Sequence, residues 1–204
     1  MAAFPRRFGL SRDGRWGRDP ELGRSRMGGA RDGVTVATVG HSNLAAEEFV
    51  ATLRRQGVAT VVDVRSVPFS QYTPQFNRAA LERTLAEAGI GYAFAGEYLG
   101  GRPTDPTCYR AGVVPTGEAN YLALVDYDEV ATRPWFRRGL ERLIEIAGAG
   151  RAAVMCSEED PLRCHRHHLI AQALLARGIA VEHIRRGGEV EPAAAEAKQL
   201  SLLP

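Results

Sequence analysis

The chain from Val34 onward alternates short apolar, β-branched runs with longer segments in which apolar residues recur at helical spacing. The short runs predict buried strands at residues 34–40, 59–66, 91–101 (ending in a glycine turn), 151–157 and 179–186. The longer segments predict helices at residues 44–58, 77–90, 119–131, 134–150 and 163–178. Residues 102–119 are rich in proline, glycine and threonine, which predicts a long surface loop.

Strands that alternate with helices predict an α/β fold, a three-layer domain with a mostly parallel sheet and helices on both of its faces. We expect a single α/β domain over residues 33–190, a disordered basic leader over residues 1–32 and a flexible or weakly helical tail over residues 191–204. Such sheets place their sites at the carboxyl ends of the strands. Polar clusters do follow four of the predicted strands, so we expect the site there.

Composition narrows the class of protein. A chain of 204 residues fits one domain, and 45% hydrophobic with 25% charged residues is typical of a water-soluble globular protein. The net charge of +2 is too small to indicate nucleic-acid binding, but residues 1–32 carry eight arginines and could act as an electrostatic arm. The three cysteines and the lack of a secretory h-region predict reduced thiols in the cytoplasm. No run is long enough to span a membrane.

The first predicted strand runs into Gly40, His41, Ser42 and Asn43. Ser42 or Asn43 suits the N-cap of the next helix, and backbone N–H groups at such a helix start also bind anions. A histidine is less expected in this turn, so we interpret His41 as functional and Ser42 as either a cap or a substrate-binding residue. The segment matches neither the P-loop nor the G-x-G-x-x-G pattern, so it carries no nucleotide fingerprint.

The second predicted strand ends on Asp63 and Arg65, which lie two residues apart and face the same side. Isolated buried charges are costly, so the two could form a structural ion pair. We favour a second interpretation, in which Asp63 orients Arg65 as a bidentate donor to a substrate carboxylate or phosphate. Ser70, Tyr72 and Phe76 follow in a proline-stiffened segment. Its aromatic rings could cover a flat ligand such as a base or pack on the sheet.

Residues 156–168 hold two cysteines, three histidines and two adjacent glutamates. One interpretation is a zinc or iron centre with Cys156, Cys164, His165 and His168 as ligands. His165 and His168 lie three positions apart and would share a helix face. The seven residues between the cysteines match none of the usual zinc templates, which weakens this interpretation.

Two other chemistries fit the same segment. Cys164 at a helix start would have a lowered pKa and thiolate character, although neither cysteine has the arginine that a C-x5-R phosphatase loop requires. We favour carboxylate chemistry instead, in which Glu158 is the general acid/base and His165 or Arg166 binds or polarises the substrate. A loop that is simply hydrogen-bonded to close the core is the structural alternative.

Four segments, "TVGHSN", "VVDVRSVPFSQYTPQFN", "YLGGRP" and "CSEEDPLRCHRHHLIA", follow one another in an order that resembles a known family. The chain resembles the "domain of unknown function 488", the YeaO-like uncharacterised bacterial proteins, over about residues 34 to 188. The resemblance implies an α/β domain with a polar cleft built from these four segments, and it implies no established reaction.

Together these features predict a cytoplasmic enzyme, a hydrolase or group transferase, that acts on a small anionic or nucleotide-like ligand. Arg65 and the helix beginning at Cys164 would bind the anion, and Glu158 would move the proton with help from His41 and Asp63. Two alternatives stay open: a metal-binding protein centred on the cysteine and histidine cluster, and a nucleic-acid-associated module that uses the leader. No cofactor is predicted beyond the zinc or iron of the first alternative.

Overall fold

A computed structural model describes residues 33–117 and 119–197. These residues form one six-stranded sheet in the order β3-β2-β4-β1-β5-β6, in which every pairing is parallel except that of β5 with β6. The strands are β1 (Thr35–Gly40), β2 (Thr60–Asp63), β3 (Gly91–Phe94), β4 (Ala152–Cys156), β5 (Ala180–Ile184) and β6 (Val190–Pro192). The α-helices are α1 (Ala46–Arg55), α2 (Arg78–Glu87), α3 (Gly96–Leu99), α4 (Tyr121–Leu124), α5 (Tyr127–Thr132), α6 (Pro134–Ala149) and α7 (Gln172–Leu175). Three 3₁₀ turns, η2 (Pro74–Phe76), η3 (Pro106–Cys108) and η4 (Pro161–Arg163), and a π-helix, η5 (Arg166–Ala171), complete the elements.

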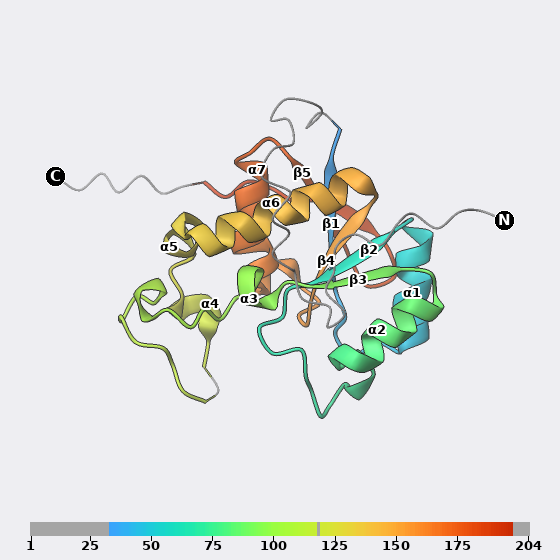
Figure 1. The fold of residues 1–204 in the computed structure, drawn as a ribbon, viewed down its shortest axis with the longest axis horizontal. Coiled ribbons are helices and arrows are strands. Elements are labelled where there is room, and N and C mark those ends of the chain that lie inside the picture. Colours follow the sequence, from blue (N-terminus) through green and yellow to red (C-terminus); the bar gives the residue numbers. More distant parts are fainter. Residues whose placement is uncertain (1–32, 118, 198–204) are drawn as a thin grey trace, which may run out of the picture.

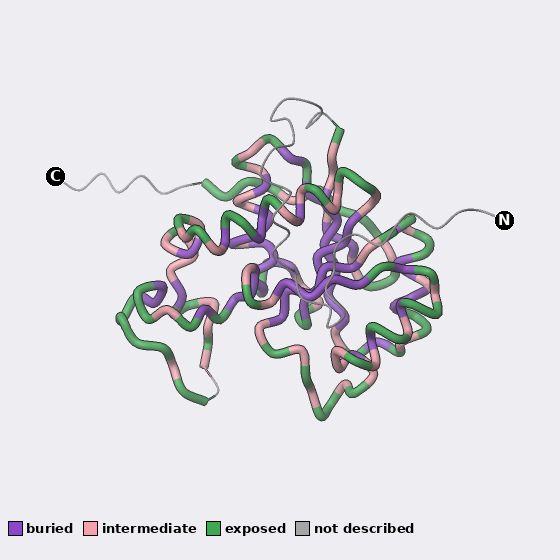
Figure 2. Tube along the Cα trace, viewed as in Figure 1, coloured by how far each residue is buried: buried purple, intermediate pink, exposed green. Residues whose placement is uncertain are grey.

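Helices cover both faces of the sheet, which confirms the predicted α/β fold (Figure 1). On one face α1 and α2 enclose a core that includes Phe49, Leu53 and Leu85. On the other face α6, η5 and α7 enclose a second core that includes Leu140 and Ile170. The central strands β1, β2 and β4 are the most continuously buried part of the described chain (Figure 2). Apolar burial on both faces therefore stabilises the sheet, as in other parallel sheets.

The register aligns the carboxyl ends of the three central strands. Gly40 at the end of β1 pairs with Cys156 at the end of β4, and Asp63 at the end of β2 pairs with Met155. Side chains alternate between the faces, so Asp63 and Arg65 lie on the α1–α2 side whereas Cys156 belongs to the core on the α6 side. The polar segments thus lie at the same, carboxyl-terminal end of the strands, but their side chains point to opposite faces of the sheet.

Four predicted elements differ from those observed. The strand expected at 91–101 is β3, which ends at Phe94, followed by the short helix α3. The helix expected at 119–131 is two short helices, α4 and α5, because Val125 is extended and the side chain of Asp126 caps α5. The helix expected at 163–178 begins at Arg166, as a π-helix, and Cys164 is extended. The expected tail begins in a strand, β6, which pairs with the edge of β5.

The remaining expectations about the ends of the chain lie outside the described residues. They concern the leader over residues 1–32 and the last seven residues, 198–204. Among the described residues, no helix is long and apolar enough to cross a membrane.

Candidate functional site

A cleft of about 1010 Å³ lies at the carboxyl ends of β2 and β4. Its walls come from five parts of the chain: residues 65–67 with 69–72, residues 101 and 102, residues 119–122 with Tyr127, residues 156–158, and residues 163–165. This volume is at the upper end of the range for small-molecule sites. The segments that the sequence singled out after β2 and β4 therefore do line a common cavity, together with the loop between α3 and α5.

Almost all N–H groups of the Arg65 guanidinium donate hydrogen bonds to other groups of the protein. Its Nε and Nη2 atoms donate to the two carboxylate oxygens of Asp63, at 2.9 and 2.7 Å, and Nη2 also donates to the backbone oxygen of Phe76 at 2.8 Å. The hydroxyl of Tyr92 donates to the same carboxylate at 2.9 Å. Asp63 has no exposed surface, and Arg65 reaches the cleft with 4% of its own. The geometry favours the structural ion pair over the ligand-binding interpretation that we preferred, and it leaves Arg65 at most one N–H for a ligand.

His41 completes the support of Arg65 from β1. Its Nδ1 lies 2.8 Å from the backbone oxygen of Ser42, so Nδ1 carries the proton and donates. Its Nε2 then accepts from Nη1 of Arg65 at 3.2 Å. Burial, followed by the charge of Arg65, lowers the pKa of His41 to about 4, so the ring is neutral at pH 7. The ring stacks on Phe76 at 4.2 Å between centroids.

Two of the predicted ligand-binding residues on this side lie away from the cleft wall. Phe76 is completely buried between His41 and Phe49, so it supports the histidine and cannot cover a ligand in the cleft. Ser42 adopts a positive φ of 47° and bonds to Asn43, outside the cleft lining. Ser70 and Tyr72, by contrast, do line the cleft, and Tyr72 is 86% exposed.

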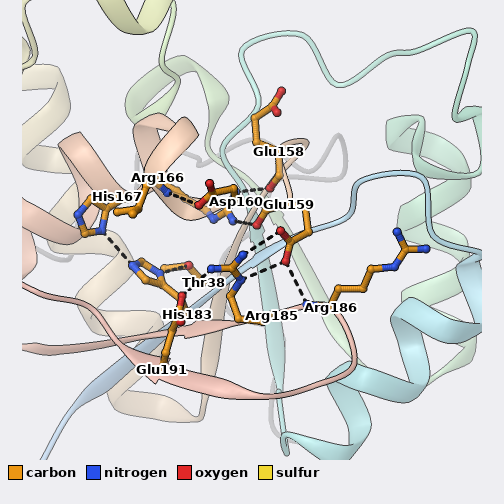
Figure 3. Close-up of polar contacts among 11 residues, drawn as sticks. Thr38, Glu158, Glu159, Asp160, Arg166, His167, His183, Arg185, Arg186 and Glu191 are labelled. Carbon is orange, nitrogen blue, oxygen red and sulfur yellow. Dashed lines mark hydrogen bonds and ion pairs between the residues drawn. The ribbon is translucent and has the colours of Figure 1, made fainter.

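Arg166 fixes the loop that carries Glu158. It is 1% exposed, and its two terminal nitrogens donate to the backbone oxygens of Glu158 and Glu159 (Figure 3). Gly40 packs against the same loop so closely that a Cβ there would collide with the backbone oxygen of Glu158. Arg166 therefore positions this loop and is not part of the cleft wall, in contrast to the substrate-binding role that we expected.

The two adjacent glutamates have different surroundings. Glu159 forms a two-pronged ion pair with Arg185, at 3.1 and 3.0 Å, which lowers the pKa of its carboxyl group. The side chain of Glu158 points away from that pair and is exposed in the cleft (Figure 3). Its carboxylate has no hydrogen bond or ion pair with any residue in the described part of the chain. Glu158 is thus the carboxylate that remains available to a ligand.

Cys156, Cys164 and His165 meet in the cleft floor. The Nδ1 atom of His165 lies 3.8 Å from Sγ of Cys156 and 3.7 Å from Sγ of Cys164. All three residues are buried, and both cysteines are free thiols. Gly101 lies against the flat of the imidazole, where a Cβ would come within 2.5 Å of Cγ of His165. The glycine of the "YLGG" segment is therefore needed for this arrangement.

The pKa values of the two thiols shift in opposite directions. A hydrogen bond from Cys156 holds the pKa of Cys164 well below its ordinary value, with further lowering by His165 and Arg166. The same contact, together with burial, raises the pKa of Cys156. We expected a lowered pKa for Cys164 from the start of a helix, but the helix begins two residues later. The neighbouring thiol is the main cause.

His168 lies away from this cluster. It belongs to a second group, with His167 and Glu196, beside the beginning of the tail. The expected alignment of His165 with His168 fails because the segment forms a π-helix, whose i→i+5 hydrogen bonds change the number of residues per turn. His167 bonds instead to His183, which in turn bonds to Thr38 (Figure 3). The structure therefore brings together three of the four expected metal ligands.

The sequence did not point to four other residues of the cleft wall, namely Arg102, Tyr121, Tyr127 and Arg163. Arg102 lies 4.4 Å above the ring of Tyr121, and Arg163 directly precedes Cys164. Neither arginine forms an ion pair with a carboxylate in the described ranges. Burial raises the pKa of Tyr127, and nearby Cys164 and Cys156 raise it further. Arg102 lies in the proline-rich loop, which gave no periodic signal, although its position directly after "LGG" offered a hint.

A family model described as "Domain of unknown function DUF488" matches residues 45–173, more than half of the chain. The chain belongs to this family. The match to DUF488 runs from the start of α1 into α7 and covers the cleft segments after β2, α3 and β4. No curated protein and no solved structure matches the chain. The DUF488 description names no reaction, so function has to be argued from the cleft.

Proposed function

We propose that the protein is an enzyme that binds a small anionic or nucleotide-like ligand in this cleft and transfers or hydrolyses a group on it. One observation carries the proposal. In the described part of the chain, a single cavity is lined both by cations that lack carboxylate partners and by one free carboxylate. Arg102 and Arg163 supply the positive charge and Glu158 the carboxylate. A cleft with convergent polar groups of this kind is the usual form of a catalytic site.

The anion would be held mainly by Arg102 and Arg163. Both are exposed in the cleft, whereas the guanidinium of Arg65 is largely used by Asp63. Tyr121 already lies beneath Arg102, and Tyr72 is exposed on another segment of the wall. A flat ring could stack between such groups while its anionic part meets the guanidinium groups. Arg65 would contribute its remaining Nη1 hydrogen as a fixed donor.

Glu158 would act as the general acid/base. It follows β4 by two residues, and contacts with Arg166 and Gly40 fix the position of its backbone. Its carboxylate forms no ion pair in the described part of the chain that would neutralise its charge. Such a group can accept a proton from an attacking water or hydroxyl and return it to the leaving group. His41 and Asp63 would assist indirectly, because both hold Arg65.

The first experiment measures binding. Thermal-shift and calorimetric titrations with AMP, ADP and inorganic pyrophosphate at low salt should show binding to the parent protein. Arg102→Ala and Arg163→Ala should each weaken it about tenfold or more, because a charged hydrogen bond contributes about 1.5–3 kcal/mol. Arg138→Ala, on the exposed face of α6, is the matched control and should bind as the parent does. If no anion shifts the melting temperature of the parent, the proposal is wrong.

The second experiment separates binding from chemistry. Glu158→Gln removes a negative charge from the cleft, so anion affinity should hold or rise. Turnover of the nucleotide panel should fall about 100-fold or more, which is typical for loss of a general acid/base. Glu141→Gln, exposed on α6, is the matched control. A Glu158→Gln protein that keeps full turnover would remove this residue from the mechanism.

A further inference from the structure

The ligand atoms of Cys156, Cys164 and His165 lie close to the separations that a tetrahedral zinc ion requires. Zinc–sulfur bonds of about 2.3 Å and zinc–nitrogen bonds of about 2.1 Å at tetrahedral angles put sulfur and nitrogen about 3.6 Å apart, and two sulfurs about 3.8 Å apart. The observed Sγ to Nδ1 distances are 3.8 and 3.7 Å, and all three atoms lie within 4.8 Å of one another. Small movements of the two thiol side chains would complete the geometry.

The imidazole of His165 is otherwise poorly satisfied. Its Nε2 is buried and has no hydrogen-bond partner within the described residues, and its Nδ1 contacts only the two sulfurs there. The residue itself is 8% exposed. Buried polar atoms without partners are rare because each one costs free energy. The two sulfur contacts of Nδ1 are long, so a metal ion on Nδ1 would give that atom a stronger partner and fix the orientation of the ring, while Nε2 would stay without one among the described residues.

Charge and position also suit a catalytic metal. Two thiolates neutralise a dication, so the occupied cluster could stay buried without net charge. Three protein ligands of the Cys₂His type leave the fourth position open, as in catalytic zinc sites. All three residues line the same cleft as Glu158.

We propose that Cys156, Cys164 and His165 bind one zinc ion, whose fourth position holds the water that attacks the ligand. This deepens the proposed function, on which it rests, toward hydrolysis. Zinc lowers the pKa of a bound water, and Glu158 accepts the proton that the water loses. The water oxygen bonds to the electrophilic atom of the substrate, the bond to the leaving group breaks, and Glu158 returns the proton to that group. No electrons are exchanged with an external partner.

The second group, His167, His168 and Glu196, is the competing site within the described chain. Its atoms are already paired: His167 bonds to His183, and His168 bonds to Glu196 and to the backbone oxygen of Leu162. The satisfied state of these groups disfavours a metal there. His168→Ala is therefore a matched control, because it removes one possible ligand of this second site and leaves Cys156, Cys164 and His165 in place.

The test uses full-length protein produced without a histidine tag and purified without chelator. Elemental analysis should find about one zinc ion per chain in the parent and in His168→Ala, and far less in Cys164→Ser and His165→Ala. Replacement of zinc by cobalt should give the parent an absorption band from thiolate-to-cobalt charge transfer, which reports sulfur ligands directly. Circular dichroism checks that each variant is folded.

Three results would overturn the inference: parent protein that binds neither zinc nor cobalt, metal that disappears with His168→Ala, or a cobalt complex without the thiolate band. The cobalt spectrum of the parent decides the matter even if a cysteine variant fails to fold. If AMP or pyrophosphate still binds to protein that takes up no metal, the zinc inference fails and the proposed function stands. If the cluster binds metal but no anion binds in the cleft, the zinc site stands and the proposed function fails.

Discussion

The neutral state of His41 predicts how stability depends on pH. The residue is 3% exposed, and burial with the charge of Arg65 lowers its pKa from 6.5 to about 4. Between pH 6.5 and pH 4, His41 is therefore mostly protonated in the unfolded chain and mostly neutral in the folded chain. The free energy of unfolding should fall as the pH drops through 6.5 and stop responding to this group near pH 4.

The magnitude follows from the two pKa values. The linkage relation gives a loss of about 2 kcal/mol between pH 7.5 and pH 5, and about 3 kcal/mol in full below pH 4. Urea unfolding at pH 7.5 and pH 5 measures this loss in the parent and in His41→Gln. Glutamine can accept from Arg65 but cannot be protonated, so the variant should lose about 2 kcal/mol less than the parent over the same interval.

The comparison cancels the other titrating groups. His183, whose pKa is also lowered to about 4 by burial and by His167, contributes equally to both proteins. Any fixed loss from the missing contact of His41 with Phe76 is independent of pH and drops out as well. If His41→Gln and the parent lose the same free energy between the two pH values, the folded protein tolerates a charged His41. The network assigned to Arg65 would then be wrong.

Three substitutions test the packing around the cleft. Asp63→Asn leaves the buried Arg65 unpaired and should lower the free energy of unfolding by about 3–5 kcal/mol. Tyr92→Phe removes one buried hydrogen bond to the same carboxylate and should cost only about 1–2 kcal/mol. Gly101→Ala forces a Cβ against the ring of His165 and should cost about 1–3 kcal/mol. Urea unfolding at pH 7.5 measures all three, and Gly101→Ala should also weaken the cobalt band.

Controls for these substitutions come from the same chain. Gly148→Ala, on α6, places its Cβ in open space and should stabilise the protein by about 0.5–1 kcal/mol through helix propensity. Equal losses for Asp63→Asn and Tyr92→Phe would mean that the arginine is satisfied by other groups. A Gly101→Ala protein as stable as the parent would show that the imidazole can move freely.

Much of the fold could be predicted because its strands have a strong local signal. The runs around β1 and β2 are rich in β-branched residues, and every residue of β4 is buried, as expected for strands covered by helices on both sides. Elements with a weak local signal were not predicted. β6 is three exposed residues whose pairing comes from the edge of β5, so its own sequence shows no strand pattern.

The segments that line the cleft were easier to predict than the contacts of their individual residues. The segments after β2 and β4 do line the cleft, because a parallel sheet brings the ends of its strands together. Whether Arg65 faces a ligand or its own neighbours depends on long-range contacts with His41 and Phe76, which no local pattern encodes. The same holds for Arg102, which reaches the cleft only through the path of an irregular loop.

The π-helix η5 makes the cysteine and histidine cluster depend on the length of the chain as well as on its composition. A π-helix differs from an α-helix by the equivalent of one inserted residue. Deletion of one residue between 166 and 171 would restore α-helical winding and rotate Cys164 and His165 by about 100° relative to α7. The cluster would then be dispersed although all of its side chains were still present. Family members that have both cysteines and the histidine but one residue fewer in this helical segment should therefore lack the assembled cluster. A one-residue gap in this segment would thus say more about the site than a substitution would.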